Sequence, residues 1–315
     1  MTHTVDVIIP NYNGVALLTA CLDSLRGQTR RDFRVLVVDD ASSDDSLAVL
    51  RERYPEVDLL ALPSNGGFVR AVNAGIVHSA APIVVLLNND TVADPRFIEQ
   101  LAGALDRYPR YAFAAAKLIL FDQPGRLHSA GDGYGWDGVP FSRGVWQPDA
   151  GQYDVLAEVF GPCAGAAAYR RAALEALADQ RGDVLDAELG MYCEDVDLNL
   201  RARRAGLRTI FVPQATVLHH LSATGGGVTA SYGCGRNFIV VWAKNLPPGL
   251  LLRSLPRFAL AQLGITLAAL RHIRGAAARA RLRGQWAGLK ALPAVWRERR
   301  FAAWESTNLS PWIGR

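Results

Sequence analysis

The sequence predicts an α/β fold: a mostly parallel central sheet flanked by helices, followed by a C-terminal helical extension. Short apolar segments alternate with amphipathic segments of helical period over residues 5–90. Half of the 315 residues are hydrophobic, enough for one large core with an appendage or for two modest domains. The four cysteines show no CxxC spacing, so neither a zinc site nor a disulfide framework is expected.

Four segments have the short, β-branched or leucine-rich character of buried strands. They are Val5–Pro10, Phe33–Asp40, Val57–Pro63 and Pro82–Asp90. Between them, apolar residues recur at one-face helical spacing from Leu17 to Leu25, at Leu47 and Leu50, and from Phe68 to Ile76. This repeated order of strand, helix and strand predicts right-handed crossovers and a parallel sheet covered on both faces.

Polar residues follow each of these strands. They are Asn11 and Asn13, Asp39 and Asp40, Ser64 and Asn65, and Asn88 to Asp90. Asn and Asp also end strands simply because they form turns, and for one strand end alone that interpretation is favoured. Four such ends on one edge of a parallel sheet instead predict a ligand site there.

The ligand at this edge is expected to include a divalent cation. No GxGxxG turn follows the first strand and no P-loop is present, so a dinucleotide fold and a P-loop enzyme are excluded. The carboxylates of Asp39, Asp40 and Asp90 repel a diphosphate unless a hard cation stands between them. Mg²⁺ or Mn²⁺, held by carboxylates and phosphate oxygens, is the expected cofactor.

A second group of acids begins a predicted helix near Glu194 that ends before Gly206. Asp197 and Arg201 are spaced for an ion pair within it. Acids in the first turn are also explained by the helix dipole alone. His219 and His220 follow a strand-like segment, so only one of them faces the site; a lone histidine is more often a packed residue than a ligand.

Two glycine-rich segments are predicted to be loops. His128–Asp154 contains Tyr134, Trp136 and Trp146, which either stack on a ligand or fill a small satellite core. Ser222–Asn237 is predicted to be a flexible loop that closes over a diphosphate, with Arg236 either reaching a phosphate or remaining solvated. Between them, Gly161–Arg171 is predicted to contain a close-packed strand.

The C-terminal region is basic, although the net charge of the chain is only +4. Its apolar run Phe258–Leu270 is too short to span a bilayer, and arginines flank it. Peripheral membrane association is one interpretation; a helical cap or a homodimer interface is the other. No nucleic-acid-binding module accompanies the arginines, and no secretion signal begins the chain, so a cytoplasmic protein that does not bind nucleic acid is expected.

The motifs, taken together, resemble those of family 2 glycosyltransferases with the GT-A fold, a Rossmann-like architecture, and especially the bacterial rhamnosyltransferase-like branch. The resemblance rests on "VIIPNYNG", "VVDDASSDDS", "NGGFVRAVNAG", "VVLLNNDT", "YCEDVDLNLRARRAG" and "VLHHLSATGG", and it covers residues 5–245. It implies a catalytic, nucleotide-sugar-binding domain over residues 1–245 and a basic, amphipathic helical region over residues 246–315.

The resemblance also implies roles for particular residues. Asp195 matches the catalytic base, supported by Glu194, and Asp90 and His219 match the metal ligands, with His220 as the second choice. Asn88 stands where the metal motif usually has its first Asp. The residues matched to the nucleotide and the donor sugar are Pro10, Asn11, Tyr12, Asn13, Asp39, Asn65, Arg70, Asn73, Asn88 and Asn89.

The implied function is inverting, metal-dependent transfer of a sugar in cell-surface polysaccharide synthesis. The donor is a nucleotide-diphosphate sugar, either dTDP-rhamnose, which the branch favours, or a UDP-sugar. The acceptor is a saccharide or a lipid-linked saccharide. A non-catalytic protein that binds nucleotide sugars or acts as a scaffold on the same fold is the alternative, because fold alone does not determine function.

Overall fold

The computed structural model describes residues 3–220, 227–298 and 309–314. The chain forms two compact units that interleave in sequence. Of the described residues, the first unit contains 3–132, 142–187 and 207–220, and the second contains 133–141, 188–206, 227–298 and 309–314. The predicted division of the chain at residue 245 remains a prediction.

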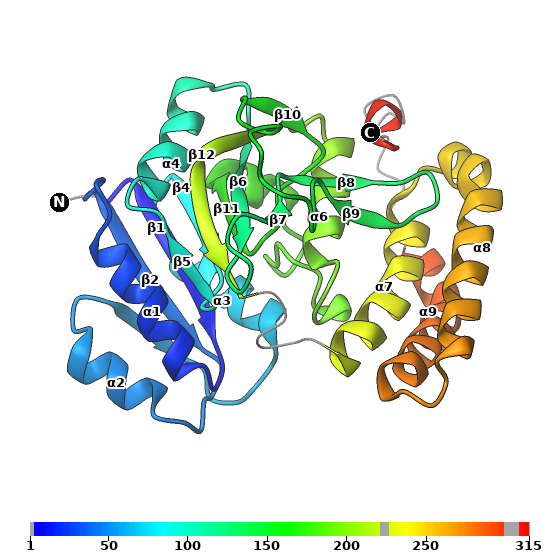
Figure 1. Ribbon diagram of the computed structural model, residues 1–315, viewed down its shortest axis with the longest axis horizontal. Helices are drawn as coiled ribbons and strands as arrows, with labels where there is room; N and C mark the ends of the chain where they lie inside the picture. The colour runs from blue at the N-terminus through cyan, green and yellow to red at the C-terminus, as the bar shows by residue number, and fades with distance from the viewer. Residues whose placement is uncertain (1–2, 221–226, 299–308, 315) are drawn as a thin grey trace. The chain divides into compact units, whose positions relative to one another are not determined.

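The first unit begins with the predicted alternation of strands and helices (Figure 1). The strands are β1 (Val5–Asn11), β2 (Phe33–Asp39), β3 (Asp58–Ala61) and β4 (Ile83–Leu87), and the helices between them are α1 (Val15–Arg26), α2 (Ser46–Arg53) and α3 (Phe68–His78). The strands pair in parallel in the order β3, β2, β1, β4. This part of the predicted parallel sheet is confirmed.

The prediction that all four strands are buried is wrong for β3. It is only four residues long, and both of its end residues, Asp58 and Ala61, are exposed. The cause is its place in the sheet: β3 lies at the edge and pairs only with β2. A charged residue on a short edge strand discourages further strand pairing.

Beyond β4 the sheet contains both antiparallel and parallel pairs, so it is mixed as a whole. The predicted strand in Gly161–Arg171 is β11 (Ala166–Arg170), which runs antiparallel between β4 and β6 (Phe113–Leu120). The remaining strands of this sheet are β5 (Thr91–Ala93), β7 (Leu127–Ser129), β10 (Ala157–Val159) and β12 (Thr209–His219). Three consecutive alanines of β11 are fully buried, because their small side chains let the sheet pack closely against its cover.

Alternating residues of β1 face opposite layers of the core. Val5, Val7 and Ile9 belong to the main apolar cluster, together with buried leucines of α1 and the buried face of α4 (Phe97–Arg107). Ile8 faces the other side, where α3 lies so close that a Cβ on Gly75 would sit 2.5 Å from Ile8 Cγ2. The sheet is therefore covered on both faces, as a strand order with crossover helices requires.

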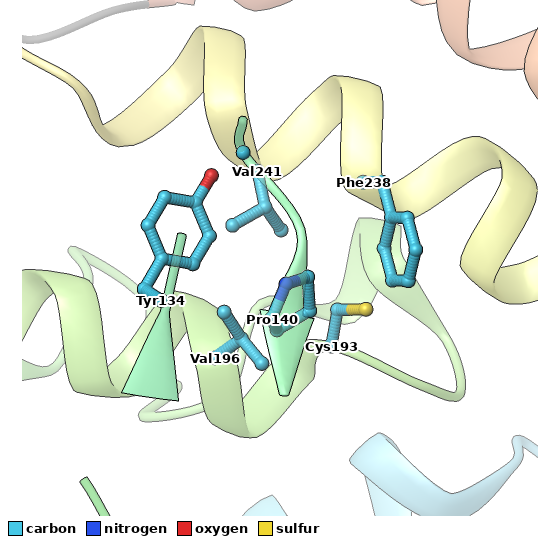
Figure 2. Close-up of a pocket in the computed structure, with 7 residues that line it drawn as sticks. Tyr134, Pro140, Cys193, Val196, Phe238 and Val241 are labelled. Atoms are coloured by element: carbon cyan, nitrogen blue, oxygen red, sulfur yellow. The ribbon is translucent and has the colours of Figure 1, made fainter. Parts of the chain in front are cut away.

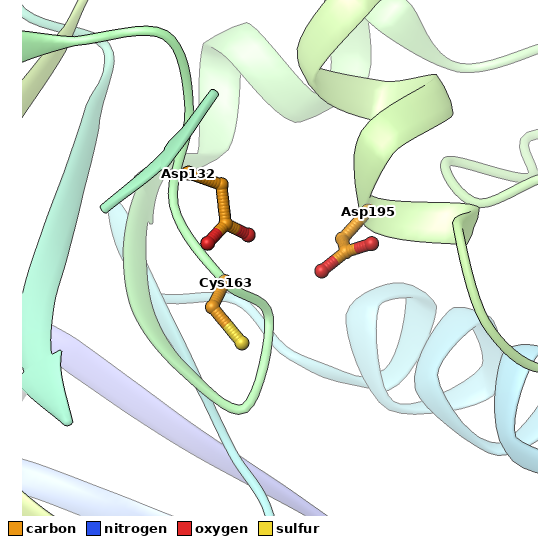
Figure 3. A group of neighbouring side chains, drawn as sticks. All are labelled: Asp132, Cys163 and Asp195. Atoms are coloured by element: carbon orange, nitrogen blue, oxygen red, sulfur yellow. The ribbon is translucent and has the colours of Figure 1, made fainter. Parts of the chain in front are cut away.

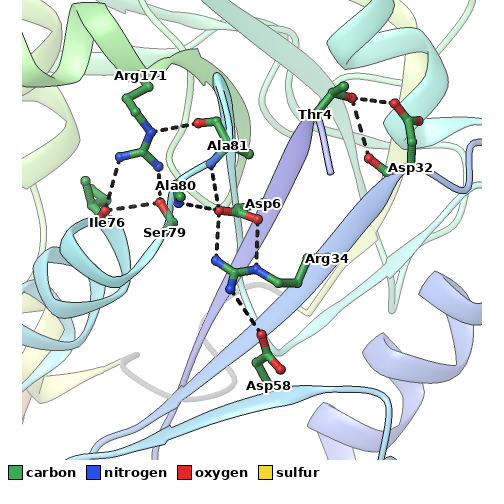
Figure 4. Close-up of polar contacts among 10 residues, drawn as sticks. All are labelled: Thr4, Asp6, Asp32, Arg34, Asp58, Ile76, Ser79, Ala80, Ala81 and Arg171. Carbon is green, nitrogen blue, oxygen red and sulfur yellow. Dashed lines mark hydrogen bonds and ion pairs between the residues drawn. The ribbon is translucent and has the colours of Figure 1, made fainter. Parts of the chain in front are cut away.

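One buried carboxylate ties three segments of the first unit together (Figure 4). Asp6 of β1 accepts two hydrogen bonds from Arg34 of β2, each at 3.0 Å, and accepts the backbone N–H groups of Ala80 and Ala81 at 2.8 and 3.0 Å. Burial raises the pKa of Asp6, but these hydrogen bonds outweigh burial and hold the pKa below its usual value. The ionised carboxylate thus fixes the segment that leads from α3 into β4.

The second unit is mainly helical. Its helices are α6 (Glu194–Arg204), α7 (Val228–Asn245), α8 (Pro248–Arg271), α9 (Ala276–Glu298) and the short η3 (Ser310–Trp312). The turn between β8 (Asp132–Tyr134) and β9 (Pro140–Ser142) also belongs to it. Short α5 (Arg171–Leu177) lies in the first unit, and η1 (Ala187–Leu189) joins the two units in sequence.

The prediction of a flexible loop over Ser222–Asn237 is wrong for its second half, which forms the start of α7; residues 222–226 lie outside the described residues. The glycines there permit close helix packing rather than flexibility. A Cβ on Gly235 would lie 2.6 Å from the backbone oxygen of Arg281 in α9, and a Cβ on Gly284 would lie 2.2 Å from that of Tyr232 in α7. Small residues of this kind let two helix backbones approach each other.

Helix α8 carries an exposed apolar face. Leu252, Leu260, Leu263, Leu267 and Leu270 are each between 47 and 71% exposed. None of the described helices is both long enough and apolar enough to cross a membrane.

Candidate nucleotide and cation site

Hydrogen bonds join the carboxyl ends of β1, β2 and β4, as the sequence predicts for one polar edge. Asn11 Nδ2 donates to Asp39 Oδ2 at 2.9 Å, and Asn11 Oδ1 accepts from Asn89 Nδ2 at 2.8 Å. All three side chains are buried. A Cβ on Gly14 would lie 2.4 Å from Asn89 Nδ2, so only glycine leaves room for this network.

Asp39 is fully buried and accepts further hydrogen bonds from Ser42, through its backbone N–H at 2.9 Å and its hydroxyl at 2.7 Å. Ser42 Oγ in turn accepts the backbone N–H of Asn13 at 2.8 Å, and Asn13 Oδ1 accepts the N–H of Ser43 at 2.7 Å. Asn13 has a positive φ of 49°, a conformation that Asn tolerates better than most residues. The loops after β1 and β2 therefore hold each other.

Tyr12 lies in sequence between Asn11 and Asn13 and is 49% exposed, whereas Pro10 is buried within β1. A half-exposed aromatic ring beside buried hydrogen-bonding groups is suited to stack on a planar ligand. A nucleobase is a planar ligand of this kind, because it can stack on the Tyr12 ring and hydrogen-bond to a few neighbouring polar groups.

Asp40 positions the loop after β3. Its two carboxylate oxygens accept the backbone N–H groups of Gly66 and Gly67 at 2.8 and 2.7 Å. Asn65 and Arg70 in and after this loop are exposed, and Arg70 donates to Ser64 Oγ at 3.1 Å. An exposed guanidinium held over such a loop remains accessible to a phosphate group.

Asn73 has a structural contact that the sequence did not reveal. Its amide nitrogen donates to the carbonyl of Leu185 at 2.8 Å, and its amide oxygen accepts the N–H of the same residue at 2.9 Å. This paired hydrogen bond fastens the segment near residue 185 to α3. These two hydrogen bonds explain why Asn73 is buried, and no bound ligand is needed to satisfy its side chain.

Asp90 and His219 are brought together by strand pairing. Strand β5 pairs antiparallel with β12, and Thr91 lies opposite His219 in the register, so Asp90 lies next to the histidine. His219 Nε2 is 3.2 Å from Asp90 Oδ1, and both side chains are buried. His220 points elsewhere, stacking on Phe121 with ring centroids 3.6 Å apart. His219 is therefore the histidine that lies beside Asp90, and its role as a metal ligand remains a prediction.

The donor atoms at this point suit a hard divalent cation. Asn88 Oδ1 and Asp90 Oδ1 are both buried; within the described parts of the chain Asn88 Oδ1 has no hydrogen-bond partner, and Asp90 Oδ1 has the ion-pair contact with His219 Nε2 at 3.2 Å. Orphaned buried oxygens are unfavourable unless something else binds them. Gly165 lies against the same group, since a Cβ there would be 3.4 Å from Asn88 Nδ2 and 3.6 Å from His219 Cε1. Two oxygens and one imidazole nitrogen are ligands that Mg²⁺ or Mn²⁺ accepts.

His128 adjoins this group and was missed by the sequence analysis. Its Nδ1 is 2.8 Å from His219 Nδ1, and its side chain is 8% exposed. Burial, followed by the neighbouring His219, lowers the pKa of His128 to about 3. It lies in a glycine-rich segment without periodicity, so no sequence signal distinguished it.

The acids of the second unit begin α6, as predicted. Residue Cys193, just before the helix, has a positive φ of 67°, which turns the chain sharply into the first turn. Asp195 Oδ1 accepts the N–H of Val196 at 2.8 Å. Glu194 is buried, and burial together with the charge of Asp195 raises the pKa of Glu194 well above its usual value. The raised pKa of Glu194 favours its neutral form next to Asp195, and enzymes often pair an acid group with a base group in this way.

Asp197 is structural. It is fully buried and pairs with Arg201 and Lys244, both at 2.8 Å, and accepts from Asn245 Nδ2 at 2.7 Å. The predicted pair with Arg201 is confirmed. Burial raises the pKa of Asp197, but the two cations lower it more, so the net pKa lies far below its usual range.

Arg236 has a structural contact in place of the two alternatives considered for it. It donates to the carbonyl of Glu188 and to Asn237 Oδ1, each at 2.8 Å. Asn237 in turn donates to the carbonyls of Leu189 and Tyr192 at 2.9 and 2.7 Å. Together they attach the segment that precedes α6 to helix α7.

The aromatic residues of the central segment divide between core and surface. Tyr134 is 1% exposed and lines a narrow apolar pocket of the second unit with Val196, Phe238 and Val241 (Figure 2). Trp146 is 52% exposed. Tyr134 therefore belongs to the satellite core that was one of its two interpretations.

Asp132 and Cys163 lie near each other in the first unit, with Sγ and a carboxylate oxygen within 4.8 Å. Asp132 Oδ1 accepts from Ser129 Oγ at 3.0 Å. Figure 3 draws this pair, and also Asp195 in the first turn of α6.

Comparison with known proteins gives the family context of this arrangement. The family model described as "Glycosyl transferase family 2" matches residues 6–178. An "N-acetylglucosaminyl-diphospho-decaprenol L-rhamnosyltransferase" of Mycobacterium tuberculosis is 29% identical over 263 residues, covering 74% of this chain and 81% of that protein. An "N-acetylglucosaminyltransferase" of Mesorhizobium japonicum is 31% identical over 230 residues, covering 67% of this chain and 50% of that protein.

Among solved structures, a mannosyltransferase from Pyrobaculum calidifontis in complex with GDP-Man and Mn²⁺ has a similar fold. The TM-score is 0.57 at 19% sequence identity, and the match covers 95% of this chain and 87% of that one. At this identity the likeness concerns the fold alone.

Proposed function

The chain belongs to glycosyl transferase family 2 and is a glycosyltransferase with the GT-A fold; on this premise we propose that it is an inverting, metal-dependent enzyme of cell-surface polysaccharide synthesis. It moves a sugar from a nucleoside-diphosphate sugar to a saccharide or lipid-linked acceptor. Rhamnose is the favoured sugar, because a relative with high coverage is named an L-rhamnosyltransferase.

The observation that carries the proposal is that two buried oxygens lie beside His219 Nε2: Asp90 Oδ1 at 3.2 Å from it, and Asn88 Oδ1, which has no hydrogen-bond partner among the described residues. These three side chains would hold Mg²⁺ or Mn²⁺. When bound, the cation neutralises charge on the departing diphosphate. The hydrogen-bonded network of Asn11, Asn89 and Asp39 leads directly from this group to the loops that would bind the nucleobase beside Tyr12.

Asp195 is proposed to act as the base. The acceptor hydroxyl must lose its proton as it attacks the anomeric carbon, and an ionised carboxylate within hydrogen-bond reach removes that proton. Attack from the face opposite the leaving diphosphate inverts the configuration. Glu194, whose pKa is raised by burial and by the charge of Asp195, would support Asp195 in this role.

Transfer is tested with Asp195→Asn and a panel of dTDP-, UDP- and GDP-sugars. We expect kcat for donor hydrolysis or transfer to fall by a factor of about 10²–10⁴, with little change in the donor-induced shift of Tm. Wild-type turnover by the variant would refute the base. Activity that persists unchanged in EDTA would refute the metal, and the absence of any turnover by the wild type across the panel would favour a non-catalytic sugar-nucleotide-binding protein.

Peripheral attachment to the cytoplasmic face of the membrane is part of the same proposal. It is supported by the exposed leucines of α8 and by arginines next to them in the helix. A lipid-linked acceptor presents its sugar at a membrane surface, so attachment there would raise the local acceptor concentration.

A further inference from the structure

His128 is a buried imidazole to which the proposed reaction gives no role. It lies in β7, which pairs with β6, and β6 pairs on its other side with β12, the strand of His219. The two rings stack with centroids 4.8 Å apart and an interplanar angle of 24°. Their Nδ1 atoms are 2.8 Å apart, a hydrogen-bond distance.

A hydrogen bond between two Nδ1 atoms needs one donor and one acceptor. If His219 Nε2 binds a cation, that nitrogen presents its lone pair, and the ring proton of neutral His219 must be on Nδ1. His219 Nδ1–H then donates, and His128 Nδ1 accepts. The opposite arrangement would place the proton of His219 on Nε2, pointing toward Asp90 and away from any role as a ligand.

We propose that His128 is a positioning residue for the cation site: by accepting the Nδ1 proton of His219, it keeps Nε2 of His219 available as a ligand beside Asp90. The inference rests on the proposed metal-dependent function. Metal-binding histidines commonly donate their second ring nitrogen to such a partner, which fixes the tautomer and the ring orientation. Here the partner is a second histidine rather than a carboxylate or a carbonyl.

Packing alone would also explain a buried, stacked ring, so the test must separate shape from hydrogen bonding. His128→Asn and His128→Leu have side chains of the same branching. The amide oxygen of Asn lies about as far from Cβ as Nδ1 does in His and can accept the proton, whereas Leu cannot. Both variants lose the same ring stacking.

Binding of Mn²⁺ is measured by the loss of its free electron paramagnetic resonance signal, with dTDP or UDP present. We expect His128→Leu to weaken binding by roughly 10–100-fold and His128→Asn to lie much closer to the wild type. In a His219→Ala background neither change should weaken binding further, because His128 acts through His219.

Equal losses in the two variants, no loss in His128→Leu, or a further loss in the His219→Ala background would overturn the inference. Failure of the wild type to bind Mn²⁺ would instead refute the metal part of the proposed function. A second readout needs no variant: ¹⁵N chemical shifts of the wild-type histidines report the tautomers. The proton is expected on Nδ1 of His219 and on Nε2 of His128, and a neutral His219 with its proton on Nε2 would also overturn the inference.

Discussion

Asp195 and Asp197 are identical residues in one helix turn for which we expect different roles, catalytic for Asp195 and structural for Asp197. Asp197 is fully buried and surrounded by Arg201, Lys244 and Asn245, which use its carboxylate to join α6 to α7. Asp195 lies in the first turn of the same helix, where its Oδ1 accepts the N–H of Val196, next to Glu194, whose pKa is raised by burial and by the charge of Asp195. The sequence spacing predicted this division correctly for Asp197, because its partner Arg201 is one helical turn away.

Replacing Asp197 with Asn should destabilise the protein. The change leaves two buried or half-buried cations without their anion, so we expect a loss of about 3 kcal/mol in the free energy of unfolding at pH 7. Because the folded pKa of Asp197 is depressed, its contribution is complete above the unfolded pKa near 4 and declines as the pH falls through the folded pKa.

Urea unfolding of the wild type and Asp197→Asn at pH 7 and pH 3 measures both effects. The difference between the two proteins should be smaller at pH 3 than at pH 7. A difference that stays the same at both values would show that the charge of Asp197 is not what stabilises the α6–α7 contact.

Glu194 should have the opposite pH dependence. Its folded pKa is raised by burial and by Asp195, so the folded state holds a proton that the unfolded state releases above about pH 4.3. Stability therefore falls as pH rises from that value toward the folded pKa. Glu194→Gln removes this decline, and unfolding curves at pH 5 and pH 8 should show a smaller drop for the variant. Parallel declines in both proteins would contradict the assignment.

At the scale of secondary structure, strand register decides which histidine meets Asp90. The sequence could predict that only one of two adjacent strand residues faces the site, since strand side chains alternate. Alternation alone does not decide which one, because β5, the three-residue strand that pairs with β12, has no pattern of its own; only the resemblance to the family favoured His219. His128 was missed for the same reason: its partner becomes a neighbour only through the pairing of β6 with two other strands.

The glycines of α7 and α9 offer a direct test of helix packing. A Cβ on Gly284 would lie 2.2 Å from the backbone oxygen of Tyr232. To relieve this overlap the backbone of helix α7 or α9 would have to move. We expect Gly284→Ala to destabilise the second unit by roughly 1–3 kcal/mol despite the better helix propensity of Ala. Gly264 in α8 is a matched control, since a Cβ there would meet nothing within 4 Å.

Gly264→Ala should leave stability unchanged or raise it by up to about 1 kcal/mol. Thermal and urea unfolding compare the two variants with the wild type. Equal effects of the two substitutions would mean that the contact between α7 and α9 does not depend on the absence of a side chain at Gly284.

At the scale of the whole molecule, the sequence predicted the first half of the sheet well and the remainder less completely. Buried parallel strands carry a strong local signal in their apolar runs, and the polar residues at the ends of β1, β2 and β4 do lie together. The antiparallel insertion of β11 and the interleaving of two units depend on contacts between distant segments. The helix at Val228 was obscured because its glycines resemble those of a loop.

The distribution of charge and exposed leucine along the chain gives a prediction about membrane attachment. Leu260, Leu263 and Leu267 recur every three or four residues, so they share one face of α8, and they are 68, 53 and 47% exposed. Arg253 and Arg271 lie two and three helical turns from Leu260, next to the same face. Leucines bordered by arginines are typical of helices that lie in the interface of an anionic bilayer.

We expect the protein to sediment with vesicles that contain phosphatidylglycerol, and to do so less with phosphatidylcholine alone or at high salt, because each arginine near an anionic surface contributes about 1 kcal/mol. The double variant Leu260→Gln, Leu267→Gln should bind vesicles at least about 10-fold more weakly. It lacks two leucine side chains whose transfer from water into the bilayer would stabilise binding. Val77→Gln is the matched control, because Val77 is 72% exposed but belongs to α3 of the first unit. Equal binding by the wild type, the double leucine variant and Val77→Gln would exclude α8 as the attachment surface. The exposed leucines of α8 would then be better explained as an interface between two copies of the chain, which sedimentation velocity would detect as a dimer.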